Sequence, residues 1–336
     1  MVAITIPTAE EWDTFIRQQP NGHALQLSAY ADLKCAYGWE AERFGLIDGD
    51  ALVGGAQVLF RPLPLNTGRM AYVAMGPYCS TPEQWDLLWK SIKHKAAFLK
   101  WEAGIRPPTM EQLPYNQWGF KASPQTIQPP STILIDITSN DDAIMARMNQ
   151  GTRRKIRKSL KNDIDYREGD RADLERFAEL MQTTGERNAF GVHEANYYRL
   201  AYDLFVEKGD GVLLVAEHEN DLLAGILVVA VGDTAWYLYG ASSNVKRNLM
   251  ASYGIQWHAI QWSKARGHKV YDLWGIPDED QATLEAQFKE RSDGLWGVYG
   301  FKRGWGGDVV RSEGTWDKIY NPFIYKAYTM ALKLRG

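Results

Sequence analysis

The chain has 336 residues, of which 45% are apolar and 24% are charged, and its net charge is −3. This length suggests two domains, and this composition excludes a disordered or fibrous protein. The charge excludes a strongly basic nucleic-acid packaging protein but allows a local basic patch. Two cysteines, Cys35 and Cys79, exclude a disulfide scaffold and a cysteine-rich zinc site.

No targeting or membrane-spanning segment is predicted. Residues 1–12 lack a cationic stretch followed by an apolar run, so they do not resemble a signal peptide. The most apolar run, 222–232, is too short to cross a bilayer and predicts a buried strand. We therefore expect a cytoplasmic protein that is still able to touch a membrane surface.

The first part of the chain alternates between helical and strand patterns. Thr8 and Glu11 have the spacing of a capping box and predict a helix that runs to Gln19. An Asp-Gly turn at 48–50 predicts a hairpin. In chain order the predicted elements are helices 8–19 and 28–37, the hairpin 39–47 and 51–60, strand 69–75, helix 82–101 and strand 132–137.

The second part repeats this order. A basic helix is predicted over 141–161, followed by a helix over 173–187, a hairpin of 211–218 and 222–231, strand 235–239, helix 250–266 and strand 270–274. An aromatic strand then runs into Lys302. The hairpin segment 45–54 also resembles 216–225. This repeated order predicts an α/β (α+β) chain of two tandem acetyltransferase-like (GNAT) domains, each a mixed sheet flanked by helices.

Several kinds of catalytic site are excluded by their missing motifs. The six histidines lack His or Cys partners at ligand spacing, and no HExxH sequence occurs, so no metal site is predicted. Glycine-rich phosphate loops and a GxSxG elbow are also missing from the sequence. We expect neither a resident cofactor nor a serine nucleophile.

A dense basic run forms the most prominent charge pattern. On a helix, Arg153, Arg154, Arg157, Lys158 and Lys161 fall on one face, whereas Ile156 and Leu160 fall on the other. This pattern fits either a solvated helix face or a surface that binds phosphates. Cations without interleaved acids repel each other, which a bound polyanion would relieve.

Other candidates are aromatic. Strand alternation predicts that Tyr237 and Tyr239 share one face, as core edge or as the lining of a groove. A polar and aromatic loop is predicted over 184–198 between two helices. Lys302, followed by glycines, could either stabilise an oxyanion or solvate a turn.

Taken together, these segments resemble the FemABX family, the non-ribosomal peptidyltransferases that build peptidoglycan cross-bridges. The resemblance rests on short segments that follow one another in order along nearly the whole chain. They are 26–30 with Lys34 and 38–39, 152–157, 184–187 with Phe190 and 197–198, 239–242, 271–276, and 299–307.

The resemblance implies a fold and a reaction. Family members have two acetyltransferase-like domains and a C-terminal helix, here 322–334, that returns to the first domain. It thus predicts domain one over 1–145 joined by 320–336, and domain two over 146–319. Members transfer an amino acid from aminoacyl-tRNA to an amine of the stem peptide, on UDP-MurNAc-pentapeptide or on lipid II. The chain resembles compact members without a coiled-coil arm, and we expect a monomer.

The resemblance also implies roles for individual residues. Lys302 would stabilise the tetrahedral intermediate, with Phe301 as its stacking neighbour, and Lys34 would bind the diphosphate of the acceptor. His193 stands where many relatives have an arginine, and it lacks a guanidinium's bidentate fork. The expected acceptor-binding residues are Lys34, Arg187, His193, Tyr197, Tyr198, Tyr237 and Tyr239, and the expected tRNA-binding residues are Arg153, Arg154, Arg157, Lys158 and Lys161.

Three alternatives remain open from the sequence. An acetyl-CoA-dependent N-acetyltransferase would need close backbone approach to a pyrophosphate, and segment 245–252 has cations but no glycine pair there. A non-catalytic RNA-binding module would bind through the basic face without turnover. A relative that aminoacylates a different amine would carry the same residues.

Overall fold

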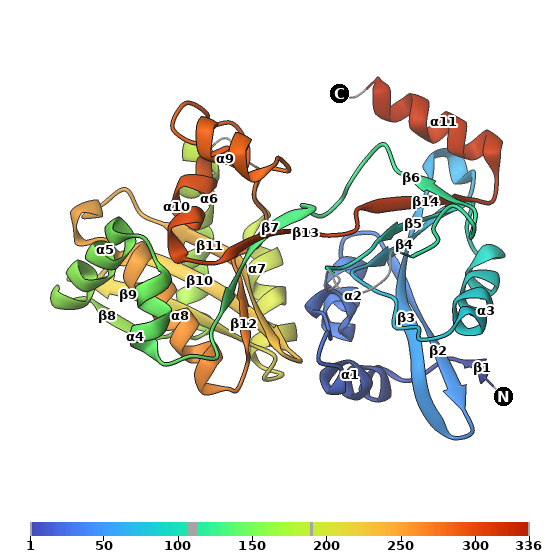
Figure 1. Cartoon of the computed structure of the whole chain (residues 1–336), viewed down its shortest axis with the longest axis horizontal. Coiled ribbons are helices and arrows are strands. Elements are labelled where there is room, and N and C mark those ends of the chain that lie inside the picture. Colours follow the sequence, from blue (N-terminus) through green and yellow to red (C-terminus); the bar gives the residue numbers. More distant parts are fainter. Residues whose placement is uncertain (1, 106–112, 189–190, 335–336) are drawn as a thin grey trace. The chain divides into compact units, whose positions relative to one another are not determined.

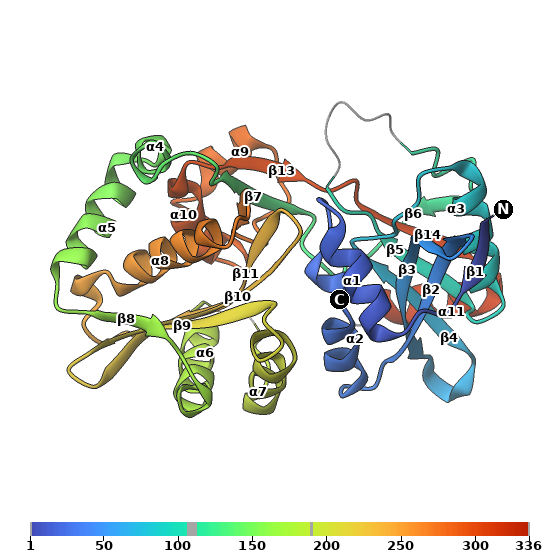
Figure 2. The same cartoon turned by 90° about the horizontal axis from the view of Figure 1, so that it is seen from below.

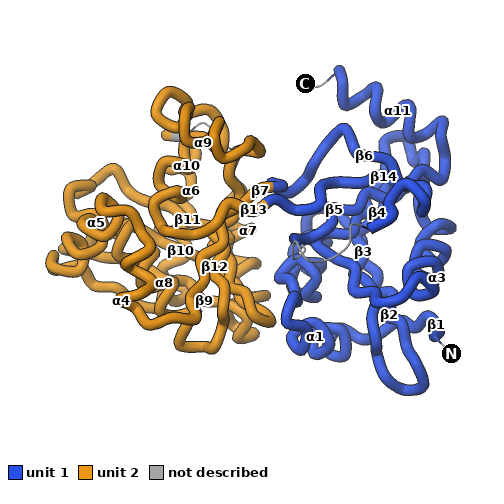
Figure 3. Tube along the Cα trace, in the orientation of Figure 1, with its two compact units in different colours: residues 1–130, 311–336 blue, residues 131–310 orange. Residues whose placement is uncertain are grey.

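The computed structural model describes residues 2–105, 113–188 and 191–334 (Figure 1). The chain forms two compact units (Figure 3): unit 1 comprises Met1–Pro130 and Arg311–Gly336, and unit 2 comprises Ser131–Val310. Both divisions lie earlier in the chain than the predicted 145/146 and 319/320. The reason is that residues 131–136 already form a strand of the second sheet, and residues 315–319 form a strand of the first.

Unit 1 is a mixed sheet with helices on both faces. Its helices are α1 (Ala9–Gln18), α2 (Ser28–Cys35), α3 (Pro82–Lys93) and α11 (Pro322–Lys333), with short 3₁₀ helices at Ala24–Gln26 and Pro64–Asn66. Its strands are β1 (Val2–Thr5), β2 (Glu40–Asp48), β3 (Ala51–Pro62), β4 (Arg69–Ala74), β5 (Phe98–Glu102), β6 (Phe120–Ala122) and β14 (Thr315–Ile319).

The strand order in unit 1 is β1-β2-β3-β4-β5-β14-β6. Only the β4–β5 pair is parallel among the pairs formed by β1 to β6 and β14 in the described residues. The C-terminal strand β14 is inserted between β5 and β6, so the sheet needs residues that follow unit 2 in the chain. Trp85 and Leu88 of α3 pack on one face of this sheet, and α11 packs against Phe98 on the other.

Unit 2 contains the remaining elements. Its strands are β7 (Ser131–Asp136), β8 (Asp165–Glu168), β9 (Gly211–His218), β10 (Asp221–Val231), β11 (Thr234–Ser242), β12 (Val270–Asp272) and β13 (Asp308–Arg311). Its helices are α4 (Asp141–Arg147), α5 (Gln150–Lys161), α6 (Leu174–Asn188), α7 (Ala195–Ala201), α8 (Ala251–Ala265), α9 (Gln281–Gln287) and α10 (Trp296–Lys302). Short 3₁₀ helices lie at Arg171–Asp173, Arg247–Leu249 and Arg303–Trp305, and a π-helix lies at Tyr202–Val206.

The second sheet repeats the plan of the first. Its strand order is β13-β7-β12-β11-β10-β9-β8. Strands β8 to β11 pair antiparallel, β11 and β12 pair parallel, and β7 pairs antiparallel with β12. Helices α6 and α7 cover one face of this sheet, and α8 covers the other (Figure 2). The two hairpins that looked alike in sequence, β2–β3 and β9–β10, occupy equivalent places, and each carries a register shift.

Several predicted elements differ from the observed ones. The predicted helix 82–101 is α3 followed by β5, and the predicted helix 141–161 is two helices, α4 and α5. The predicted aromatic strand before Lys302 is the helix α10, because Trp296 and Tyr299, three residues apart, both pack into the core of unit 2. The Thr8–Glu11 capping box is present as predicted. Among the helices of the described ranges, none is long and apolar enough to cross a membrane.

Candidate functional site

The two parallel strands of unit 2 part at one point. Pairing between β11 and β12 ends at Trp236 and Asp272, whereas β11 continues to Ser242. The chain leaves β12 through Trp274, whose φ of +61° is a left-handed conformation that is uncommon for a side chain of this size. The carboxyl ends of β11 and β12 therefore diverge here, and open α/β sheets bind ligands at the carboxyl ends of their strands.

The Lys302 ammonium lies where β11 and β12 diverge. Lys302 is the last residue of α10 and is only 6% exposed. Its Nζ donates to the carbonyl oxygens of Gly275 (2.7 Å) and Trp274 (3.4 Å), and lies 5.8 Å from the centroid of the Tyr237 ring. Burial lowers the pKa of Lys302 to about 8, and the charge of Asp272 opposes this shift. Lys302 is thus a buried cation that keeps most of its charge at neutral pH.

Asp272 shapes the turn that holds Lys302. Its carboxylate accepts hydrogen bonds from the Thr132 hydroxyl and from the Trp274 backbone N–H (2.7 Å). Burial raises the pKa of Asp272 to about 6, against the lowering effect of these donors and of Lys302. No sequence motif assigned a role to Asp272, although an aspartate at the end of a buried strand is itself a signal of a polar task.

Phe301 faces away from the Lys302 ammonium. Its ring meets Tyr253 edge-on at 5.0 Å between centroids and lies 5.7 Å from Trp305. The Lys155 ammonium lies 4.6 Å from the centroid of the Tyr253 ring and donates to the Tyr253 hydroxyl at 3.0 Å. Phe301 therefore joins α10 to α8 and α5, and its expected role beside Lys302 remains a proposal.

The prediction that Tyr237 and Tyr239 share a strand face is wrong. The register between β10 and β11 shifts so that Leu227 opposes Tyr239 while Val228 opposes Tyr237, which leaves Leu238 as an extra residue. Because of this bulge, Tyr237 packs with the α8-side core and Tyr239 packs against Tyr197 and Tyr198 of α7. Sequence alternation could not reveal the bulge.

Four of the expected acceptor-binding residues form one aromatic cluster. His193 is exposed and stacks on Tyr197 with ring centroids 3.6 Å apart, and its backbone N–H donates to the Tyr198 hydroxyl at 3.2 Å. The Tyr239 hydroxyl donates to that of Tyr197 at 3.1 Å. Tyr197 and Tyr198 are 2% and 1% exposed, so their rings serve the core and His193 presents the cluster to solvent.

Arg187 lies in the last turn of α6, in agreement with the predicted helix over 173–187, so the predicted loop over 184–198 begins later than expected. Its guanidinium donates to the Ser242 carbonyl and to Asn244 Oδ1, both at 2.9 Å, and so fastens the end of β11. Burial and the nearby Arg247 lower the pKa of Arg187. Phe190, which follows in the same motif, lies outside the described residues.

Lys34 belongs to unit 1 and stands beside a second cation. Its Nζ lies 5.3 Å from the centroid of Tyr30, and burial together with Arg61 lowers the pKa of Lys34. The Arg61 guanidinium lies 5.3 Å from the centroid of Trp39. Arg61 could not be identified from the sequence, because it is distant from Lys34 along the chain and belongs to no motif. Two neighbouring cations favour a ligand with more than one negative charge.

Most of the basic face of α5 is exposed, and only Arg153 among its five cations is partly buried. This face lines an open groove of about 900 Å³ together with Gln150, Gly151 and Asn162. In the described part of the chain, Arg154, Arg157, Lys158 and Lys161 have no ion-pair partner. Arg153 differs from them, because its guanidinium donates to the carbonyls of Met148 (2.6 Å) and Ala146 (3.1 Å) at the end of α4.

The face of α5 opposite the cations carries Ile156 and Leu160, which differ in burial. Ile156 is fully buried, whereas Leu160 is 43% exposed. Lys155 takes part in the core contact instead, through Tyr253. The alkyl stem of a lysine can cover apolar surface while its ammonium meets a ring.

Comparison with known proteins decides the family. The model of the FemAB family matches residues 7–105, 107–219 and 213–333. The chain belongs to the FemAB family. A lipid II:glycine glycyltransferase of Staphylococcus haemolyticus is 26% identical over 402 aligned positions, covering 95% of this chain and 93% of the relative. A Staphylococcus aureus enzyme of the same name is 25% identical over 401 positions, with the same coverage.

Solved structures agree with this FemAB assignment. The crystal structure of FemX superimposes with a TM-score of 0.86 and 25% identity, and covers 97% of this chain and 99% of FemX. A tandem GNAT protein from the clavulanic acid biosynthesis pathway shares the fold, with a TM-score of 0.56 and 11% identity. The predicted fold class and the predicted family are confirmed, and the chain is an aminoacyltransferase.

The chain is also a compact member, as predicted. The alignments with the glycyltransferases run over more positions than this chain has residues, so those relatives carry insertions. The match to FemX covers nearly the whole of both chains, so the two are similar in length. The longest helices in the described part of unit 2, α6 and α8, have 15 residues each, too short for a long coiled-coil arm.

Proposed function

We propose that this protein transfers an amino acid from aminoacyl-tRNA to an amine of the peptidoglycan stem peptide. The neutral amine attacks the carbonyl carbon of the aminoacyl ester. A C–N bond forms, the C–O bond to the tRNA ribose breaks, and one amine proton ends on the released ribose hydroxyl. The buried Lys302 cation at the parting of β11 and β12 is the observation that carries this proposal.

The residues present suit this reaction. An aminoacyl ester is already activated, so the enzyme needs to position two substrates and stabilise the oxyanion of the tetrahedral intermediate. Lys302 is held by two carbonyl oxygens, which fix its position in advance of the reaction. A fixed cation in a buried place stabilises a developing negative charge more strongly than one in water.

Two cationic surfaces suit the two substrates. The exposed cations of α5, in the groove they line, fit the phosphates of a tRNA. Lys34 and Arg61 fit a diphosphate, which is common to UDP-linked and lipid-linked precursors. Relatives named as lipid II:glycine glycyltransferases support a lipid-linked acceptor and a glycine donor. Because aminoacyl-tRNA is the proposed donor, we expect the reaction to occur in the cytoplasm.

A transfer assay tests the proposal. The full chain is mixed with tRNAs charged with labelled Gly, Ala or Ser, and with UDP-MurNAc-pentapeptide or lipid II in separate reactions. We expect label in one of the acceptors and none with uncharged tRNA plus free amino acid. Acetyl-CoA replaces the tRNA in a parallel reaction. Acetyl transfer without any tRNA-dependent transfer to either acceptor would contradict the proposal and favour an N-acetyltransferase.

A further inference from the structure

Helix α11 exposes a row of large apolar side chains. Phe323 is 88% exposed, Met330 is 57% exposed and Leu334 is 87% exposed. Their spacing of seven and four residues places them along one side of the helix, and the exposed Ala327 lies between them. Soluble surfaces seldom align such residues, and an aligned row of this kind marks a docking surface.

The same helix is cationic. Lys326 and Lys333 are exposed, and residues 321–334 include no acidic residue. Neither lysine has an ion-pair partner within the described ranges. The exposed side of α11 therefore combines apolar side chains with positive charge, which is the pattern of helices that lie in a membrane interface.

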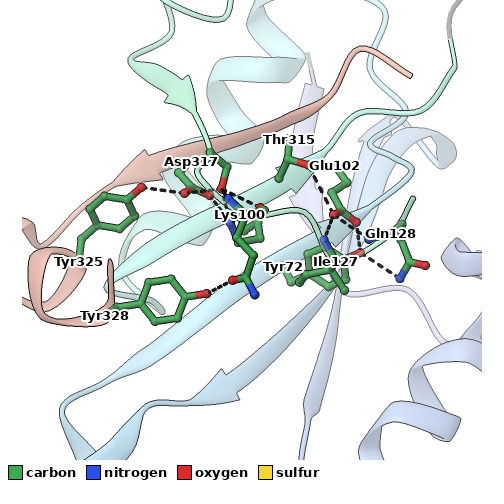
Figure 4. A network of polar contacts seen from close by, with 11 residues as sticks. Tyr72, Lys100, Glu102, Ile127, Gln128, Thr315, Asp317, Tyr325 and Tyr328 are labelled. Carbon is green, nitrogen blue, oxygen red and sulfur yellow. Dashed lines mark hydrogen bonds and ion pairs between the residues drawn. The ribbon is translucent and has the colours of Figure 1, made fainter. Parts of the chain in front are cut away.

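The opposite side of α11 is anchored to unit 1 (Figure 4). The Tyr325 hydroxyl donates to Asp317 Oδ2 at 2.8 Å, and the Tyr328 hydroxyl donates to Gln125 Oε1 at 2.9 Å. Asp317 is paired at 2.9 Å with Lys100, and both side chains are fully buried. Because these bonds fix the helix from below, it cannot roll over to bury the apolar row.

A second exposed apolar residue lies beside the start of α11. Leu65, in the turn between β3 and β4, is 95% exposed, and this turn meets α11 where a Cβ on Gly68 would lie 3.8 Å from Ile324. A recess of about 400 Å³ lies between the turn, the end of α3 and the start of α11, and Lys93 and His94 line it. Lys93 has no ion-pair partner in the described part of the chain.

We propose that α11 and the β3–β4 turn dock unit 1 onto an anionic lipid surface. This inference rests on the proposed function, because docking would bring the enzyme to the membrane that holds a lipid-linked acceptor. Phe323, Met330, Leu334 and Leu65 would enter the interface. Lys93, Lys326 and Lys333 would lie at the level of the anionic headgroups. A second copy of the chain fits this surface less well, because pairing two such faces would bring their cations together.

Vesicle flotation of the full chain tests the docking surface. The vesicles contain phosphatidylcholine with phosphatidylglycerol, or phosphatidylcholine alone, and hold no acceptor. We expect binding to the anionic vesicles that weakens with salt. The variant Phe323→Ser/Met330→Ser/Leu334→Ser is expected to lose about tenfold or more in partition, and Lys326→Gln/Lys333→Gln about tenfold.

Two matched controls separate docking from general surface effects. Ile6→Ser removes an apolar side chain that is 78% exposed elsewhere in unit 1, and Lys269→Gln/Lys289→Gln removes two cations from unit 2. Both controls are expected to bind as the unaltered chain does. Failure of the unaltered chain to bind anionic vesicles, or unchanged binding by the triple variant, would overturn the inference.

Two further readouts keep this inference apart from the proposed function. Transfer to UDP-MurNAc-pentapeptide by the triple variant is expected to match that of the unaltered chain, because this acceptor needs no membrane. Vesicle binding without transfer activity would support docking and count against the transferase. Sedimentation velocity is run in parallel. A dimer that forms in the unaltered chain and is lost in the triple variant would show that a second copy covers the apolar row, and would overturn docking onto lipid.

Discussion

Lys302 carries a charge in a place where the fold gains little from it. The side chain is 6% exposed, and burial lowers its pKa to about 8. An apolar residue of similar length would fill this space without a desolvation cost. A buried, partly compensated cation at the point where two parallel strands diverge therefore indicates a role in binding or catalysis.

Replacement of Lys302 by methionine tests that role. Lys302→Met keeps most of the volume and removes the charge, so we expect the transfer rate to fall by about 10²–10³-fold. Initial rates at saturating acceptor measure the effect, with thermal melting as a control for folding. A loss below about threefold in a folded variant would remove Lys302 from the mechanism.

The pH dependence of transfer tests the pair formed by Lys302 and Asp272. The Lys302 charge is present below its pKa of about 8 and is lost as the pH rises through that value. Activity that depends on this charge should therefore decline above about pH 8. Asp272→Asn removes an anion that raises the pKa of Lys302, so the decline should begin at lower pH.

Asparagine removes the charge of Asp272 but keeps an oxygen that can accept the hydrogen bond from the Trp274 N–H, so the variant changes the electrostatics and preserves the turn. Below about pH 6, where Asp272 becomes protonated, the two proteins should converge in rate. Rates are corrected for spontaneous ester hydrolysis at each pH. Identical alkaline limbs in both proteins would contradict the coupling.

At the scale of single residues, the sequence pointed to some functional residues but not to the residues that contact them. The basic run on α5 stood out from composition and spacing alone, whereas the role of Lys302 came from the resemblance to the family. Asp272 and Arg61 did not stand out, because their importance comes from contacts with Thr132, Trp274 and Lys34 that only the folded chain brings together. Burial of Tyr197 and Tyr198 was equally hidden, since an aromatic pair fits a core or a groove.

At the scale of elements, the bulge in β11 decides which side chains meet. It turns Tyr237 toward α8 and Lys302, and Tyr239 toward α7. Gly240 makes this possible, because a Cβ at this position would lie 2.1 Å from the Tyr237 ring. The Tyr237 ring thus occupies the space that a side chain at position 240 would need.

Gly240→Ala is expected to displace the Tyr237 ring. Overpacking of this kind destabilises a protein by about 1–3 kcal/mol, and displacement of the ring should also lower the transfer rate. Urea unfolding measures the first effect. Gly191→Ala is the control, because a Cβ there meets nothing within 4 Å. Equal stability of the two variants would show that Tyr237 does not need this glycine.

The cations of α5 are tested by their salt dependence. Arg154→Gln/Arg157→Gln/Lys158→Gln should weaken tRNA binding and flatten the slope of log affinity against log salt by about 1 for each phosphate that the helix no longer neutralises. Fluorescence anisotropy over a range of KCl concentrations measures the slope. Lys90→Gln/Lys269→Gln/Lys289→Gln removes equal charge elsewhere, and an equal slope change in both variants would dismiss α5 as the tRNA surface.

Element types were predicted well where periodicity was strong, as in the hairpins and α8. The predictions were wrong where a short segment is compatible with both a strand and a helix. Residues 296–302 look like an aromatic strand, yet Trp296 and Tyr299 become neighbours on a helix face that the core of unit 2 buries. Tertiary packing overrides local preference in segments this short.

At the scale of the whole molecule, unit 2 is inserted within unit 1. The chain leaves unit 1 at Pro130 and returns at Arg311, and the Ser312 backbone N–H donates to the Pro130 carbonyl at 2.8 Å. The two cut ends of unit 1 are therefore adjacent. The repeated element order predicted two copies of one fold, but it contained no sign that β14 would lie between β5 and β6.

Fragments test this arrangement. Residues 1–130 alone should fail to fold, because without β14 the sheet loses the strand between β5 and β6, and Lys100 loses Asp317, its buried partner. Residues 1–130 joined to 311–336 by a short glycine linker should fold, as should 131–310. Circular dichroism melting measures all three fragments. Cooperative melting of 1–130 alone would contradict the role given to β14.

The insertion of β14 also sets an order of events during synthesis. Residues 311–336 leave the ribosome only after the whole of unit 2 has been made, so unit 2 can fold while unit 1 still waits for a central strand. Until then the first sheet keeps an open edge at β5 and an unpaired charge at Lys100. A polypeptide that terminates early would expose this edge to proteases, and the cell could distinguish finished from unfinished chains by it.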